Sequence, residues 1–141
     1  MRNISKEKIS TVDSAQFFLS QLASGREVET AKIYCMLYLL ERDMRMKAKT
    51  PYLQDGFTRG AIPIPDKLST VLYAMPQQSL LYSYHNLGGD YSYFTDLDKN
   101  IHHHIIAMYG NKPLYVLQDV VKSDYYFQST KYGEHITFEN T

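Results

Sequence analysis

The sequence predicts a mainly α-helical protein, a compact bundle of about five helices with a small β-hairpin. Apolar residues recur three and four positions apart in several segments, as they do on the buried face of a helix. Prolines and glycines stand between these segments, where they start or end helices. The stretch 80–94 differs, because tyrosines alternate there with polar residues around Gly88-Gly89, a pattern typical of a hairpin.

A chain of 141 residues is most simply one domain, spanning 1–141, and is long enough to bury a hydrophobic core. The first ten residues are mostly polar, so we expect residues 1–12 to be frayed. The first helix is expected over 14–24, capped by Asp13 or Ser14. Residues 128–141 are expected to form an irregular tail, with short strands at 125–129 and 135–138.

The strongest helical pattern begins at Ala31. Its apolar positions form one stripe at helical spacing: Ile33, Met36, Leu37, Leu40 and Met44. Thr30 is the expected N-cap. Pro51 ends the helix, because proline lacks an N–H and restricts the residue before it. The one cysteine, Cys35, lies within this apolar helix, so we expect a buried thiol rather than a nucleophile.

Ile62-Pro63-Ile64-Pro65 is expected to start the next helix, with Pro65 at its first position and Asp66 in its first turn. Its buried stripe is expected to comprise Leu68, Val71, Leu72 and Met75. Of these, Leu68, Leu72 and Met75 are expected to pack against Leu37 and Leu40 of the preceding helix.

Thr95 and Asp98 form a capping-box pattern that predicts the start of a further helix, which Gly110 ends. The apolar stripe expected to be buried there comprises Leu97, Ile101, Ile105 and Met108. A last helix is expected from Pro113, with Asn111 as its cap. Its buried residues are expected to be Leu114, Leu117, Val120 and Val121.

Several motifs in this order resemble the Panacea domain family, also called the SocA-like antitoxin domain, over roughly residues 14–127. The motifs are Lys32 ahead of Met36-Leu37-Tyr38, then Asp55-Gly56-Phe57, Ile62-Pro63-Ile64-Pro65, Thr95-Asp96-Leu97-Asp98 and Met108-Tyr109-Gly110. Ile62 stands where the family has a glycine. The structural motif residues that the resemblance implies are Lys32, Leu37, Tyr38, Asp55, Phe57, Pro63 and Pro65.

The resemblance implies an antitoxin, a non-enzymatic binding protein that neutralises a cognate toxin by direct association. One branch of the family instead acts as an adapter that delivers the toxin to a protease. The resemblance therefore implies a toxin as the protein partner, with a protease or chaperone as a further candidate partner.

Tyrosine is the residue type that points to an interface, because the chain has 13 tyrosines and no tryptophan. We predict that the hairpin presents Tyr82, Tyr84, Tyr91 and Tyr93 to the partner. The alternative is that each ring is half-buried against the helices. Strand register decides between these arrangements, and the sequence does not fix it.

Catalytic and metal-binding patterns are not found in the sequence. The three consecutive histidines, His102 to His104, project about 100° apart on a helix and cannot converge on one ion. His104 is expected beside the apolar stripe, with the other two facing water. No nucleophile elbow, P-loop or dinucleotide-binding motif occurs. We therefore predict no enzyme, no metal and no cofactor, and keep a small enzyme without a recognisable motif as an alternative.

Charge argues against a dedicated nucleic-acid binder, because Lys+Arg and Asp+Glu are 15 each. The alternative, a nucleic-acid-associated regulator, would use the basic helix end formed by Arg42, Arg45, Lys47 and Lys49. A single cysteine forms no disulfide within the chain, and no window approaches the roughly 18 apolar residues of a membrane span. Residues 1–10 lack an apolar core of a signal peptide, so we expect a cytoplasmic protein without a membrane segment.

Overall fold

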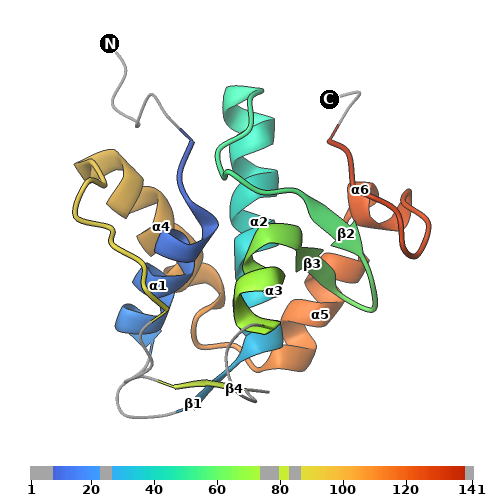
Figure 1. The fold of residues 1–141 in the computed structure, drawn as a ribbon. Coiled ribbons are helices and arrows are strands. Elements are labelled where there is room, and N and C mark those ends of the chain that lie inside the picture. The colour runs from blue at the N-terminus through green and yellow to red at the C-terminus, as the bar shows by residue number, and fades with distance from the viewer. Residues whose placement is uncertain (1–7, 23–26, 74–79, 83–86, 139–141) are drawn as a thin grey trace.

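The structure is a computed structural model, and it describes residues 8–22, 27–73, 80–82 and 87–138. It is mainly helical with two small antiparallel sheets, which confirms the predicted fold class (Figure 1). The described helices are α1 (Thr11–Leu22), α2 (Thr30–Ala48), α3 (Asp66–Tyr73), α4 (Asp96–Tyr109), α5 (Leu114–Lys122) and α6 (Tyr125–Gln128). The described strands are β1 (Glu27–Glu29), β2 (Phe57–Arg59), β3 (Pro63–Pro65) and β4 (Leu80–Tyr82). None of the described helices combines the length and apolarity needed to cross a membrane.

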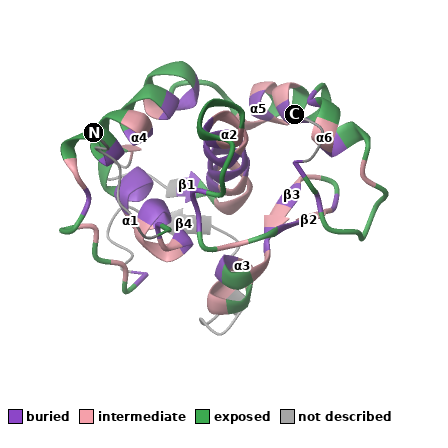
Figure 2. Ribbon diagram, turned by 90° about the horizontal axis from the view of Figure 1, so that it is seen from above, coloured by how far each residue is buried: buried purple, intermediate pink, exposed green. Residues whose placement is uncertain are grey.

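Helix α2 is the centre of the fold. It packs against α1, α4 and α5 and against strands β1 and β3 (Figures 1 and 2). The predicted stripe is buried in full: Ile33, Met36, Leu37, Leu40 and Met44. Cys35 is buried as well, and burial raises the pKa of its thiol to about 12. A helix with neighbours on most sides is buried beyond one stripe, which explains why Leu39 and Glu41 are also inside.

Helix α2 begins one residue earlier than expected, because Thr30 is its first residue and Glu29 is the N-cap. Its C-cap, Lys49, has a φ of 62°, the left-handed conformation that commonly ends helices. Pro51 follows, as predicted, and the chain then crosses to β2.

Helix α1 begins at Thr11, ahead of the expected 14–24, because Ser10 Oγ accepts from the backbone N–H of Asp13 at 3.5 Å. Ile9 is fully buried and forms a parallel bridge with Leu53. The expectation that residues 1–12 are frayed is therefore wrong for residues 8–12. Residues 1–7 lie outside the described part.

The hairpin predicted around Gly88-Gly89 is wrong in its strand pairing. Its first strand exists as β4, but β4 pairs with β1 in the register Val28 to Leu81. Residues 87–95 form an irregular segment, in which Gly88 has a φ of 83°. The hairpin of this fold is β2–β3, where Thr58 pairs with Ile64. Pro65 ends β3, and α3 starts one residue later at Asp66.

Helix α3 packs against α1 and β3. Leu68 is buried as predicted, and Leu72 is partly buried. Met75 lies outside the described residues.

Helix α4 starts with the predicted capping box, in which Thr95 and Asp98 bond each other's backbone N–H. Its rotation differs from the prediction. The residues that face the core are Asp98, His102, Ile105 and Tyr109. In the predicted stripe, Ile105 is buried, whereas Leu97 is 36% and Met108 is 44% exposed. The prediction that His102 faces water is therefore wrong.

The chain after α5 is built into the core more than expected. In α5, Leu117 and Val121 are buried and Leu114 and Val120 are partly buried. The strand expected at 125–129 is the helix α6, whose N-cap Asp124 accepts from the N–H of Phe127 at 3.1 Å.

The segment 133–138 closes over β2 rather than forming a free tail. The backbone N–H of Arg59 donates to Glu134 O at 2.9 Å, and that of Ile136 donates to Phe57 O at 2.9 Å. Ile136 and Phe138 are buried. The only strand-like pairing in the expected strand 135–138, among its described residues, is an isolated bridge between Thr58 and His135.

Candidate functional site

Of the tyrosines predicted to bind a partner, Tyr91 and Tyr93 lie in the irregular segment 87–95 and not on a strand. Tyr91 lies edge-on to Phe17, with ring centroids 5.0 Å apart. The hydroxyl of Tyr93 donates to the Asp13 carboxylate at 2.8 Å. Both contacts direct these rings onto α1. Tyr82 ends β4, and Tyr84 lies outside the described residues. The partner-binding role of all four stays a prediction.

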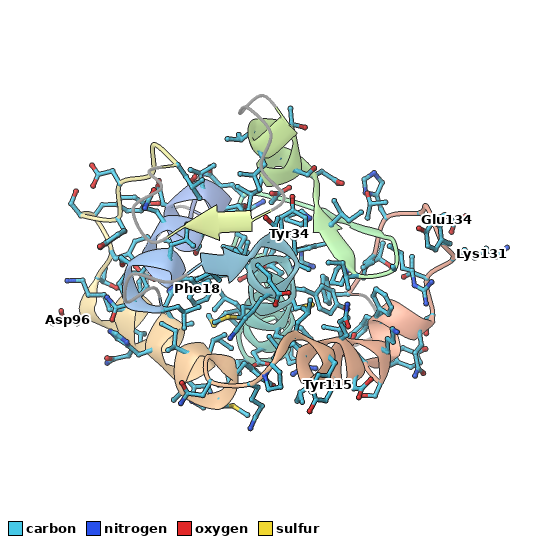
Figure 3. All side chains as sticks on the ribbon, turned by 90° about the horizontal axis from the view of Figure 1, so that it is seen from below. Phe18, Tyr34, Asp96, Tyr115, Lys131 and Glu134 are labelled. Atoms are coloured by element: carbon cyan, nitrogen blue, oxygen red, sulfur yellow. The ribbon has the colours of Figure 1, made fainter. Side chains whose placement is uncertain are left out.

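Three tyrosines elsewhere in the described part of the chain are more exposed than Tyr91 and Tyr93. Tyr115 is 68% exposed and projects from α5 at the edge of the molecule, whereas Phe18 lies in the interior (Figure 3). Tyr125 and Tyr132 are also exposed.

The motif residues behind the family resemblance hold the fold together. The buried ones are Leu37, Tyr38, Phe57, Pro63 and Pro65. The Tyr38 ring meets the Phe57 ring edge-on, with centroids 5.5 Å apart. The Tyr38 hydroxyl donates to Asp124 at 2.6 Å, which joins α2 to the start of α6.

Two charged motif residues bind the ends of helices. Lys32 Nζ donates to Gly110 O at 2.7 Å, where a cation complements the carboxyl end of α4. The Asp55 carboxylate accepts from the backbone N–H groups of Lys67 and Leu68 at 2.8 and 3.2 Å. Asp55 therefore caps α3 by binding N–H groups 12 and 13 residues further along the chain, and fixes the elbow before β2.

We expect Asp55→Ala to lower the free energy of unfolding by about 1 kcal/mol, the usual cost of losing a helix cap. The matched control is Asp119→Ala, which removes an exposed carboxylate from α5. Urea denaturation of both variants checks this. Equal stability of the two variants would show that the α3 N–H groups find other acceptors.

A buried polar cluster, which the sequence did not reveal, joins α1 to α4. It comprises Ser14, Tyr52, Asp98 and His102, and we name it the His102 cluster. His102 Nδ1 lies 2.8 Å from the backbone oxygen of Asp98, and Nε2 lies 2.5 Å from Ser14 Oγ. The carbonyl oxygen only accepts, so Nδ1 carries the proton and Nε2 accepts from Ser14. The Tyr52 hydroxyl donates to the Asp98 carboxylate at 2.7 Å.

A serine bonded to histidine is also the pair used in nucleophilic catalysis, where the histidine takes the serine proton. Here Ser14 and His102 are both fully buried. Rings of Phe17, Phe18 and Phe94 lie with centroids 5.3, 5.2 and 4.9 Å from the imidazole. These rings cover the pair, and burial lowers the pKa of His102 to about 4. This arrangement favours a structural role for the cluster.

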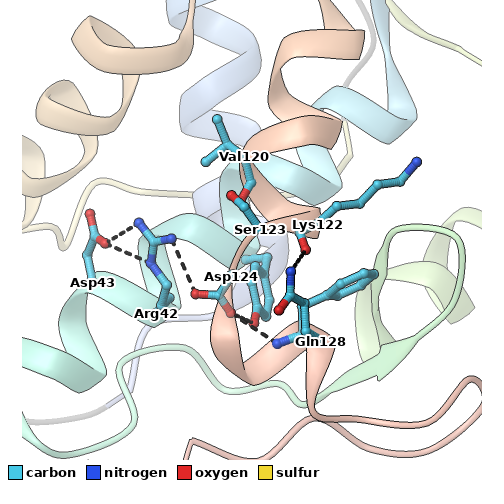
Figure 4. Close-up of polar contacts among 9 residues, drawn as sticks. Arg42, Asp43, Val120, Lys122, Ser123, Asp124 and Gln128 are labelled. Carbon is cyan, nitrogen blue, oxygen red and sulfur yellow. Dashed lines mark hydrogen bonds and ion pairs between the residues drawn. The ribbon is translucent and has the colours of Figure 1, made fainter.

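The basic end of α2 is partly neutralised inside the protein. Arg42 donates to Asp43 at 3.0 Å and to Asp124 at 3.4 Å (Figure 4). Arg45 donates to the buried carboxylate of Glu41 at 2.7 Å. Two of the four cations of the predicted basic patch are therefore committed to internal carboxylates, which disfavours a phosphate-binding surface here.

An apolar groove of about 420 Å³ lies between α2 and α4, and we name it the α2/α4 groove. Its apolar lining consists of Leu40, Met44, Ala48, Leu97, Ile101 and Ile105. Polar residues Asp43, Lys47, Asn100 and His104 complete the lining. An apolar surface with polar groups around it is typical of an interaction site.

The rotation of α4 produces this groove. Because Asp98 and His102 face the core, Leu97 and Met108 of the predicted apolar stripe turn toward solvent, whereas Ile105 stays buried. Leu97 and Met108, the partly buried Ile101 and the exposed His104 beside them lie at helical spacing along α4, and we name these four residues the outer row.

A second hollow, of about 330 Å³, is polar. It includes Lys8, Arg45 and Lys67, together with Asp55. Arg45 is paired with Glu41, and Asp55 is occupied in capping α3. Among the described residues, no cluster of three or more His, Cys, Asp or Glu side chains is arranged to hold a metal ion.

The resemblance to the Panacea domain rests on the motif residues described above. No protein-family model, curated protein or solved structure matches this chain.

Proposed function

We propose that this chain is a binding protein of the antitoxin type, which acts in the cytoplasm and neutralises a partner toxin by direct association. The α2/α4 groove is the observation that carries the proposal. In its lining, Ala48 of α2 and Leu97 of α4 are exposed, above the buried side chains of Leu40 and Ile105, and Met108 is exposed in the same row as Leu97. Such surfaces bind protein segments far more readily than polar ligands.

The distribution of reactive side chains supports binding rather than catalysis. In the core, the His102 imidazole bonds the Ser14 hydroxyl and the backbone oxygen of Asp98, and aromatic rings cover it. Delivery of the bound toxin to a protease is a second way in which the same association would neutralise it.

The test is co-expression with the neighbouring reading frame. We expect that reading frame to stop growth when expressed alone and to be tolerated with this chain. The double variant Leu97→Gln with Met108→Gln should lose this protection and bind the toxin at least about tenfold more weakly, as loss of interface anchors does. Calorimetric titration measures the binding.

Met46→Gln is the matched control, because Met46 is 54% exposed on α2 but belongs neither to the groove lining nor to the outer row. It should protect as well as the natural chain. A non-toxic neighbouring product would contradict the antitoxin proposal. Full protection by the folded double variant would place the interface elsewhere.

A further inference from the structure

The shape of the α2/α4 groove restricts what it can bind. Helices α2 and α4 run antiparallel, because Tyr52, after the end of α2, bonds Asp98 near the start of α4, and Lys32 near the start of α2 bonds Gly110 after α4. On α4 the groove lining runs from Leu97 to Ile105, and the outer row continues beyond it to Met108, a total of about 16 Å or about three helical turns. A straight trough between two antiparallel helices is the surface on which a third helix packs in helical bundles.

The backbone also favours a helical occupant. Between their ends, α2 and α4 use their backbone N–H and C=O groups in their own hydrogen bonds. An extended peptide in the groove would therefore find no backbone partners there, whereas a helix satisfies its own.

The groove lining contains one carboxylate, Asp43, and one ammonium group, Lys47, and the two differ in their pairing. The Asp43 carboxylate is held by Arg42, which approaches it through both Nε and a terminal nitrogen at 3.2 and 3.0 Å. Lys47, by contrast, is exposed and forms no ion pair or hydrogen bond with any residue in the described part of the chain. Lys47 is therefore the charged group of the lining that no described residue pairs, and an acidic group of a partner would complement it.

We propose that the groove binds an amphipathic α-helix of about three turns from the toxin, with its apolar stripe on the outer row and an acidic side chain opposite Lys47. This inference rests on the proposed function and adds the conformation and charge of the bound segment. Leu97 and Ile101 would contact the apolar stripe, and Lys47 would select the acidic partner.

The test uses three synthetic peptides of about 15 residues, long enough to cover the groove. The first has leucines at helical spacing and glutamates beside them, the second replaces the glutamates by lysines, and the third has the composition of the first in scrambled order. Each is titrated into the full chain by fluorescence anisotropy, with methyl NMR to locate the bound peptide.

We expect the first peptide to saturate and to shift the methyl signals of Met44, Leu97 and Ile101. The scrambled peptide should not saturate, and the lysine peptide should bind about threefold more weakly, the usual scale of an exposed ion pair. With Lys47→Glu, the lysine peptide should become the tighter of the two, which isolates the charge contact. Met46→Gln should change none of these affinities.

Three results would overturn the inference. Equal binding of the scrambled peptide would show that the groove does not select a helix. An unchanged peptide preference in Lys47→Glu would remove the acidic contact. Dimers in sedimentation that Leu97→Gln with Met108→Gln dissociates, together with no peptide binding, would assign the groove to a second copy of the chain. The co-expression test is independent of all three, so the antitoxin proposal can stand or fall separately.

Discussion

Leu40→Ala is expected to lower the free energy of unfolding by about 2–5 kcal/mol, because transfer and cavity terms add when a buried leucine is truncated. Leu40 is fully buried in α2, the helix that contacts most other elements. The neighbouring side chains already pack against α2, so they have little room to move into the cavity that the truncation leaves. Denaturant melts measure the loss.

Met46→Ala is the control for this variant. It shortens an exposed side chain on the same helix and should change stability by less than about 0.5 kcal/mol. A loss of less than about 1 kcal/mol for Leu40→Ala would mean that Leu40 does not face the core, and would contradict the rotation of α2 described here.

Acidification is expected to destabilise the protein through His102. Burial lowers the pKa of His102 to about 4 in the folded chain, whereas its pKa in the unfolded chain is roughly 6.5. Between these values the unfolded chain binds a proton that the folded chain does not. The contribution of the neutral His102 to the free energy of unfolding is thus fully present above about pH 6.5. It is lost as the pH falls toward 4, a total of about 3 kcal/mol.

Urea melts between pH 7.5 and 4.5 test this dependence, with two variants to separate His102 from other acids. His104→Gln changes an exposed histidine and should keep the slope. His102→Gln should be less stable at neutral pH and should lack the part of the slope between pH 6.5 and 5. Titration of the His102 imidazole near pH 6.5 in the folded protein by NMR would contradict the prediction.

Helix α2 was predicted well because its signals are local. The apolar spacing of Ile33, Leu37 and Leu40 and the break at Pro51 all act within the helix itself, and each was confirmed. Tertiary packing then buried further residues, such as Glu41, which periodicity of apolar residues does not reveal. Glu41 is tolerated inside because Arg45 and the backbone N–H of Leu53 bond its carboxylate.

The difference between the predicted and the observed rotation of α4 has the same cause. Counting apolar residues alone gives the stripe through Leu97 and Met108, although the core accepts Asp98 and His102 because both are hydrogen-bonded. Their spacing of four residues was the available signal, since it allows a histidine ring to reach the preceding turn. From the sequence, the α4 residues that line the candidate groove were therefore expected in the core.

The prediction of strand pairing was wrong for a different reason. The alternation around Tyr82 predicts an extended strand but carries no information about its partner, and β1 lies far away in the chain. The turn signal of Gly88-Gly89 suggested a neighbour instead. Tyr91 and Tyr93 then packed on α1 rather than in a ladder.

The closure of β2 by residues 133–138 has a consequence for how the protein is made. During synthesis, β2 and β3 leave the ribosome long before Glu134 and Ile136, whose backbone bonds Arg59 and Phe57. Until then the outer edge of β2 exposes unpaired backbone groups, the kind of edge at which chains aggregate. This half of the core is completed only after translation has passed Phe138, and a nascent chain stalled earlier would retain that open edge.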